Sequence, residues 1–174
     1  MKYNIDWSKS HCGVMLCSFE QTKTMMPEVS DILDELIPQL ESPVEEYLVD
    51  VKVHMLMKDQ YPCIPNWHYD FMPRDENGER VPHQATDEKM YMWLSGAPLT
   101  EYKDRDTKEV FTKPAQQWHS FTQKDLHRGS VSEGHTWRCF IRVIPKHFVH
   151  SITKNVGEQR RHCQVYLDSN KFSW

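Results

Sequence analysis

The stretch YLVDVKVHMLM, residues 47–57, decides the fold class, because its polar and apolar residues alternate. One face of an extended chain would carry Val49, Val51, Val53 and Met55. The other face would carry Asp50, Lys52 and His54. Successive side chains of a strand point to opposite sides, so a period of two predicts a half-buried β-strand rather than a helix.

Further short segments with strand character follow this stretch. They are rich in aromatic and β-branched residues, which favour strands. They read KMYMWLSG at 89–96, EVFTK at 109–113 and HTWRCFIRVI at 135–144. Asn77-Gly78 is a turn signal between strands. Many short strands separated by turns predict a mainly β domain, a sandwich or a barrel.

The N-terminal part carries the helical signal. HCGVMLCSF at 11–19 predicts a first strand, and PEVSDILDELIPQL at 27–40 predicts one helix. Apolar residues recur at helical spacing in the second segment, and acidic residues crowd its first turns. Pro27 suits the start of a helix, and Pro38 is expected to end or bend it.

Composition limits the class of protein. The chain has 174 residues, 39% of them hydrophobic and 26% charged, which is typical of one soluble globular domain. A net charge of -4 argues against generic nucleic-acid binding. No apolar run approaches the roughly 20 residues of a membrane span. The N-terminal residues do not resemble a signal peptide, so we expect a cytoplasmic protein.

The cysteines support the same compartment. The chain has five, at Cys12, Cys17, Cys63, Cys139 and Cys163. The number is odd and no CxxC pair occurs, so a disulfide framework or a zinc knuckle is not expected. Reduced thiols agree with a cytoplasmic protein.

The stretch NWHYD, residues 66–70, suggests a metal site. If it is a strand, His68 and Asp70 project to the same side. His127, in KDLHRGS, offers a third ligand. Two histidines and one carboxylate on one side of a metal leave its other side open, which suits non-haem Fe(II).

Other interpretations of these residues stay open at this level. His68 and Asp70 also fit an exposed hydrogen-bonded pair. His119, in QWHSF, and His135, at the head of the 135–144 segment, are rivals of His127 for the third ligand. Both fit the expected spacing less well.

The segment HTWRCFIRVI adds two cations on one face of a strand. Arg138 and Arg142 lie on the same side, with Phe140 between them. Two arginines that point into a barrel are costly unless anions meet them, and a guanidinium matches a carboxylate with two hydrogen bonds. A shift of one residue would instead turn Cys139 and Ile141 inward.

The order His-x-Asp, a distant His and then an Arg resembles the iron(II)/2-oxoglutarate-dependent oxygenases. The resemblance covers about residues 47–145. It implies a double-stranded β-helix (jelly roll) with one or two flanking N-terminal helices. It also implies that His68, Asp70 and His127 are the metal ligands and catalytic centre. Arg138 would bind the far carboxylate of 2-oxoglutarate.

The resemblance implies further roles and a reaction. Arg142 falls where some members have a second arginine for substrate or co-substrate, and Tyr91 is a candidate to hydrogen-bond the co-substrate. The implied enzyme uses Fe(II), 2-oxoglutarate and O₂, hydroxylates or oxidatively demethylates its substrate, and releases succinate and CO₂. The substrate stays open among small molecules, nucleotides and exposed side chains.

The expected organisation is a single domain over 1–174. Residues 47–145 would form the jelly-roll core with the metal site, 1–46 an N-terminal strand and helix, and 146–174 a C-terminal extension. Two other functions remain alternatives. One is a cupin-like metal-dependent isomerase or epimerase, and the other is a non-catalytic jelly roll that binds a small anion. The sequence indicates no oligomeric state.

Overall fold

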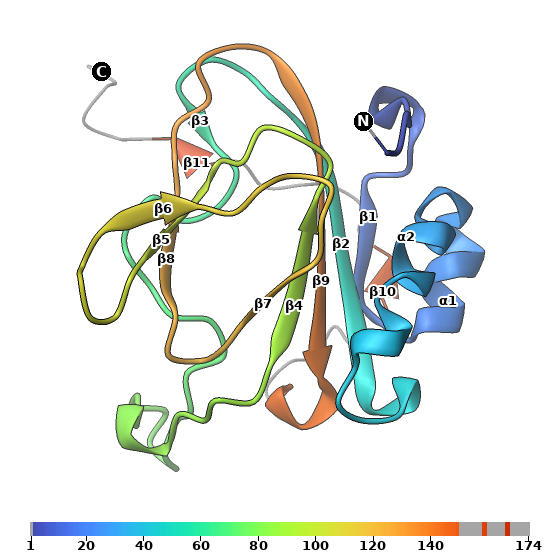
Figure 1. The fold of residues 1–174 in the computed structure, drawn as a ribbon. Helices are drawn as coiled ribbons and strands as arrows, with labels where there is room; N and C mark the ends of the chain where they lie inside the picture. Colours follow the sequence, from blue (N-terminus) through green and yellow to red (C-terminus); the bar gives the residue numbers. More distant parts are fainter. Residues whose placement is uncertain (1, 150–157, 160–165, 168–174) are drawn as a thin grey trace.

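The structure, a computed structural model, describes residues 2–149, 158–159 and 166–167. Two antiparallel sheets lie face to face, and short helices pack on the outer side of the larger one (Figure 1). This is the mainly β jelly roll that the sequence predicts, with two N-terminal helices beside it. The His68, Asp70 and His127 side chains that the sequence singles out lie in a cavity between the two sheets.

The larger sheet has the strand order β10-β1-β2-β9-β4-β7. Its strands are β1 (Gly13–Cys17), β2 (Tyr47–Leu56), β4 (Met90–Leu94), β7 (His119–Phe121), β9 (Thr136–Pro145) and β10 (Glu158–Gln159). β2 and β9 are the longest strands and pair along their whole length, from Tyr47 opposite Pro145 to Leu56 opposite Thr136. They form the centre of the sheet.

The smaller sheet has the order β6-β5-β8. Its strands are β5 (Thr100–Lys103), β6 (Val110–Thr112) and β8 (Leu126–Gly129). A separate antiparallel pair joins β3 (Gln60–Tyr61) to β11 (Tyr166–Leu167). The strands expected over 89–96, 109–113 and 135–144 are confirmed as β4, β6 and β9.

The N-terminal helices differ from the prediction. The helix expected over 27–40 is broken into η2 (Pro27–Val29), α2 (Ser30–Asp34) and η3 (Ile37–Gln39). Pro38 lies in the first turn of η3, where its missing N–H interrupts the helical ladder. The prediction of a single helix over 27–40 was therefore wrong.

Another helix, α1 (Phe19–Met25), was not predicted. It begins at Ser18, whose side chain accepts from the Gln21 backbone while the Gln21 side chain accepts from the Ser18 backbone. This is a capping box, a readable helix-start signal. The remaining 3-10 turns are η1 (Trp7–Lys9), η4 (Val44–Glu46), η5 (Pro82–Gln84) and η6 (Lys146–Phe148).

The outer face of the larger sheet builds the main core. Odd-numbered residues of β2, β4 and β9 lie with the apolar residues of the helices in one buried cluster. The sheet contributes Val49, Val51, Val53, Tyr91, Trp93, Cys139, Ile141 and Val143. Because the helices cover this face, its side chains are almost wholly removed from water.

The other face of β2 is buried as well. Asp50 is 6% exposed and His54 is 4% exposed, and both alternate with the valines of the core. The prediction of a half-buried strand was wrong because the second sheet, and not solvent, covers the polar side. This face looks into the interior of the jelly roll.

The segment 66–70 is not a regular strand. It is extended and makes one isolated antiparallel bridge, between His68 and His127. The turn at Asn77-Gly78 is present: the Gly78 N–H donates to the Asp75 carbonyl, and Gly78 has φ of +81°. Within the described ranges, no helix is long and apolar enough to cross a membrane. Most of the expected C-terminal extension, like Cys163, lies outside the described residues.

Candidate metal centre

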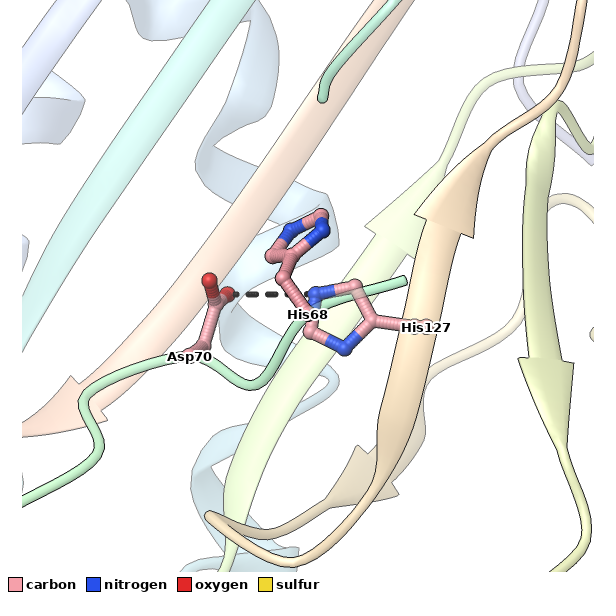
Figure 2. Close-up of side chains that lie close together, drawn as sticks. All are labelled: His68, Asp70 and His127. Atoms are coloured by element: carbon pink, nitrogen blue, oxygen red, sulfur yellow. Dashed lines mark ion pairs between the residues drawn. The ribbon is translucent and has the colours of Figure 1, made fainter. Parts of the chain in front are cut away.

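Two histidines of distant segments are locked together through their backbones. The His68 N–H donates to the His127 carbonyl at 2.9 Å, and the His127 N–H donates to the His68 carbonyl at 3.0 Å. Directly opposite residues of an antiparallel pair have side chains on the same face. The ring centroids are 4.5 Å apart. Figure 2 shows the two rings beside Asp70.

The Nδ1 atoms of both histidines already have hydrogen-bond partners. Nδ1 of His68 lies 2.8 Å from the Asn66 carbonyl, and Nδ1 of His127 lies 3.0 Å from the Asp125 carbonyl. A carbonyl oxygen only accepts, so each Nδ1 carries the proton. In the neutral ring Nε2 then keeps its lone pair, the form in which histidine binds metals.

Asp70 completes the group. Its Oδ2 lies 3.6 Å from Nε2 of His127 (Figure 2). One ligand atom from each of His68, Asp70 and His127 can be chosen so that all lie within 4.8 Å of one another. The structure thus brings together the three residues that the sequence suggested. Two imidazoles and one carboxylate are a donor set that fits Fe(II).

Arg142 holds the carboxylate of this group in place. Its Nη1 donates to Asp70 Oδ2 at 2.7 Å, and its Nη2 donates to Asp50 Oδ2 at 2.9 Å. Burial by itself would raise the pKa of Asp70, but Arg142 and then the two histidines hold that pKa well below its usual range. Asp70 is therefore ionised and oriented.

The two histidines titrate differently. Burial lowers the pKa of His68, so its ring is neutral near pH 7. Burial also acts to lower the pKa of His127, but the adjacent Asp70 outweighs it and the net shift is upward. A cation at the centre would compete with the proton that Asp70 favours on His127.

Arg138 is a second buried guanidinium with very different surroundings. It is 2% exposed, and its Nη2 donates to the Thr100 hydroxyl at 3.0 Å. Among the described residues, its Nε has no hydrogen-bond partner. In the part of the chain that the structure describes, no carboxylate forms an ion pair with it. Burial lowers its pKa, as expected for a cation that lacks an acidic neighbour.

Both arginines line one cavity of about 220 Å³ together with the His-Asp-His group. β2, β4, β7 and β9 of the larger sheet line one side of it, and β5 and β8 of the smaller sheet line the other. The lining residues that sequence analysis did not single out as site residues include Asp50, Lys52, Cys63, Thr100, Tyr102 and Tyr166. The polar face of the 47–57 stretch was the available signal for the first two.

The thiol of Cys63 in this cavity is unreactive near neutral pH. Burial raises the pKa of its thiol to about 11, so it stays protonated near neutral pH. The chain approaches β8 closely at this point: a Cβ on Gly129 would lie 2.6 Å from the Cys63 carbonyl oxygen. A side chain at Gly129 would therefore push the cavity wall away from β8.

The remaining candidates lie outside the cavity lining. Tyr91 points into the helix-covered core, where its hydroxyl donates to the Gln39 carbonyl at 3.1 Å. His119 bonds through Nε2 to the Pro114 carbonyl at 2.8 Å. His135 is exposed ahead of β9. The structure brings neither rival histidine to the Asp70 group.

The known proteins that resemble this chain resemble it in the course of the backbone alone. No protein-family model and no curated protein sequence matches the chain. Solved structures that resemble it include vicilin from Corylus avellana (hazelnut), with 9% identity, a TM-score of 0.36, and coverage of 74% of this chain and 28% of that one.

Two further similar structures are cupins. A cupin-2 domain containing protein from Shewanella frigidimarina has 6% identity and a TM-score of 0.32, over 66% of this chain and 92% of that one. A cupin protein from Bacteroides fragilis has 9% identity and a TM-score of 0.32, over 64% and 78%. At these values the chemistry of the site has to be argued from its own side chains.

Proposed function

We propose that this chain is an Fe(II)- and 2-oxoglutarate-dependent oxygenase that hydroxylates or oxidatively demethylates its substrate. The observation that carries the proposal is the pairing, in one cavity, of a His-Asp-His group with a buried arginine that has no acidic partner among the described residues. The first feature suits Fe(II), and the second suits an anionic co-substrate.

The three donors would hold the metal from one side. His68 and His127 would bind through Nε2, since both Nδ1 atoms are tied to carbonyl groups. Asp70 would bind through its carboxylate, which Arg142 orients. Fe(II) bound there with 2-oxoglutarate would supply the oxidising chemistry, in which one atom of O₂ enters succinate and the other enters the substrate.

Arg138 is the candidate for the far carboxylate of 2-oxoglutarate. A buried guanidinium costs several kcal/mol unless an anion meets it, and the Thr100 hydroxyl alone does not neutralise the charge. Arg142 is less suited to this role because two carboxylates already occupy it. The prediction of two co-substrate arginines therefore narrows to Arg138 for the carboxylate and Arg142 for orientation of Asp70.

Apolar side chains would keep water from the co-substrate. The cavity lining between the two sheets includes Met92, Phe121 and Phe140. A carboxylate–guanidinium pair is much stronger where water is excluded. A cupin-like isomerase or epimerase would use the same metal donors but would leave Arg138 without a function.

The test is anaerobic titration of the metal-free protein, first with Fe(II) and then with 2-oxoglutarate. We expect the visible metal-to-ligand charge-transfer band of the chelated co-substrate. Asp70→Ala should abolish the band, with His119→Ala as a matched control outside the cavity. Arg138→Met should shift the titration to higher 2-oxoglutarate concentrations, with the surface variant Arg105→Met as its control.

Two results would contradict the proposal. Tight metal binding without the band, in the parent protein, would favour the cupin-like metalloenzyme. Failure to bind any divalent metal would favour the anion-binding jelly roll, which needs no metal. Binding of 2-oxoglutarate should then still depend on Arg138.

A further inference from the structure

The segment that carries His68 is held to the sheet by few backbone bonds. It joins β8 through the two bonds between His68 and His127 and through a bond from the Gly129 N–H to the Ile64 carbonyl at 2.9 Å. It has no regular ladder, because the bridge at His68 is isolated. The distance between the two histidine rings therefore depends on what else fixes the segment.

Trp67 provides such a contact on the opposite side of the sheet. As the chain neighbour of His68 in an extended segment, it points away from the cavity. The indole lies beneath two cations: Lys103 Nζ is 4.6 Å from the ring centroid, and Arg128 Cζ is 4.5 Å from it. Cations at this distance from an indole are attracted to its π face. Trp67 is thus bound to side chains from both β5 and β8.

Arg128 is itself fixed. Its Nε donates to the Glu101 carboxylate at 2.7 Å, and Glu101 lies directly opposite it on β5. The arginine thus joins β5 to the indole of the 66–70 segment. A guanidinium held by a carboxylate loses little further freedom when it also lies against an aromatic ring.

Two rows of side chains therefore cross the same three segments on opposite faces. The inner row is Tyr102, His127 and His68, with ring centroids 5.6 Å and 4.5 Å apart. The outer row is Glu101, Arg128 and Trp67. Each member of the outer row is the chain neighbour of a member of the inner row, so a shift in one row moves the other.

We propose that Trp67 is a positioning residue for the His-Asp-His centre. Its attraction to Arg128 and Lys103 on the outer face keeps His68 in register with His127 on the inner face. Trp67 touches neither the donors' Nε2 atoms nor the cavity, so its effect passes only through the backbone of its neighbour. The role rests on the proposed metal site for its function, but its effect on the His68–His127 bridge is independent of metal.

Tyr69 is a built-in control. It flanks His68 on the other side, points the same way as Trp67, and is 38% exposed. Among the described residues, no cation lies over its ring. If any outward aromatic residue were enough to order the segment, both variants to alanine would behave alike.

The first experiment measures Co(II) affinity by absorption, using the full chain and Co(II) as a probe for the divalent metal. Trp67→Ala should weaken binding by about tenfold or more, the usual loss when a group that orients a ligand is removed. Trp67→Phe, which keeps an aromatic face, should recover most of it. Arg128→Gln should weaken binding in the same direction, and Tyr69→Ala should match the parent.

The second experiment measures backbone hydrogen exchange of the metal-free protein. The amides of His68 and His127 should exchange faster in Trp67→Ala and in Arg128→Gln, but not in Tyr69→Ala. Thermal unfolding of each variant identifies any general loss of fold. Arg128→Gln keeps the test decisive if Trp67→Ala does not fold.

The proposal is overturned if Trp67→Ala and Arg128→Gln keep the exchange rates of the parent, or if Tyr69→Ala loses protection equally. Faster exchange with an unchanged Co(II) affinity would overturn it too, because the bridge would then not control the donors. A parent protein that binds no Co(II) would instead contradict the proposed metal site, and the exchange data alone would decide the role of Trp67.

Discussion

The two faces of the larger sheet are built from the same strands but carry side chains of different kinds. On the outer face, alternate residues of β2 and β9 such as Val51 and Ile141 are fully buried against the helices. On the inner face, Asp50, Arg138 and Arg142 line a cavity opposite the smaller sheet. One face stabilises the fold through apolar burial, and the other holds charges that cost free energy to bury.

Two neighbouring residues of one strand therefore contribute to the protein in opposite ways. A residue of the outer face should be assessed by the volume it fills, and one of the inner face by the charge it meets. The inner face is not uniform, however. Arg142 is neutralised by Asp50 and Asp70, whereas among the described residues no carboxylate pairs with Arg138, which donates to the Thr100 hydroxyl.

The substitution Arg142→Met, on the inner face, should have the largest effect on the free energy of unfolding. It leaves the buried carboxylates of Asp50 and Asp70 without their shared cation, which should lower the free energy of unfolding by about 3–5 kcal/mol. Urea denaturation measures the loss. Arg105→Met removes two ion pairs at the solvent-exposed surface, with Asp87 and Asp125, and should cost about 1 kcal/mol or less. Equal losses in the two variants would show that the buried ion pairs of Arg142 with Asp50 and Asp70 stabilise the fold no more than exposed ion pairs do.

Ile141→Ala tests the outer face. The side chain is 0% exposed, so its truncation leaves a cavity and should lower the free energy of unfolding by about 3 kcal/mol. The folded fraction should keep the Fe(II)–2-oxoglutarate band at full intensity per molecule. A weaker band in fully folded protein would show that the two faces are coupled through β9.

Arg138→Met should affect stability and ligand binding in opposite directions. Replacing a buried cation that lacks an acidic partner by an apolar side chain should leave the free energy of unfolding unchanged or raise it by up to about 2 kcal/mol. The same variant should lose affinity for 2-oxoglutarate in an equilibrium titration. A large loss of stability would mean that Arg138 serves the fold rather than a ligand.

Tyr91→Phe should have the smallest effect. It removes one hydrogen bond to the Gln39 carbonyl, which should cost about 1 kcal/mol in denaturant unfolding. The titration with 2-oxoglutarate should not change, because Tyr91 lies on the helix-covered face. A weaker co-substrate affinity would restore the role that the sequence suggested for this tyrosine.

Periodicity accounts for most of what the sequence predicted. The alternation in β2 and β9 places Arg138 and Arg142 on one face whatever the rest of the fold does. The same rule brings His68 and Asp70 to one side even though their segment makes only one bridge, because any extended chain alternates. These predictions are local and need no knowledge of packing.

Long-range packing accounts for what the sequence could not decide. Alternation marks Asp50 and Lys52 as a polar face but does not tell solvent from a lined cavity. Spacing favoured His127 over His119, but the pairing of the 66–70 segment with β8, which brings His127 beside His68, is a long-range contact that spacing does not give. The orientation of Tyr91 depends on β4 lying beside β9.

The helical region shows a different kind of error. Its apolar spacing is helical, but Pro38 lacks the N–H that would continue the helical ladder, and α2 and η3 are separate short elements. The capping box of Ser18 and Gln21 could have revealed α1, since its two side chains satisfy amide groups that a helix start leaves unpaired.

The bridge from Asp50 through Arg142 to Asp70 has a consequence for the order of events in biogenesis. Arg142 is 72 residues from Asp70 in the chain and 92 from Asp50, so the bridge forms only once β2 and β9 have paired. From then on Asp70, the carboxylate of the proposed metal site, already has a cation beside it. The proposed metalloenzyme would therefore complete its folding first and receive its metal afterwards, unlike small domains that remain unfolded until a metal binds.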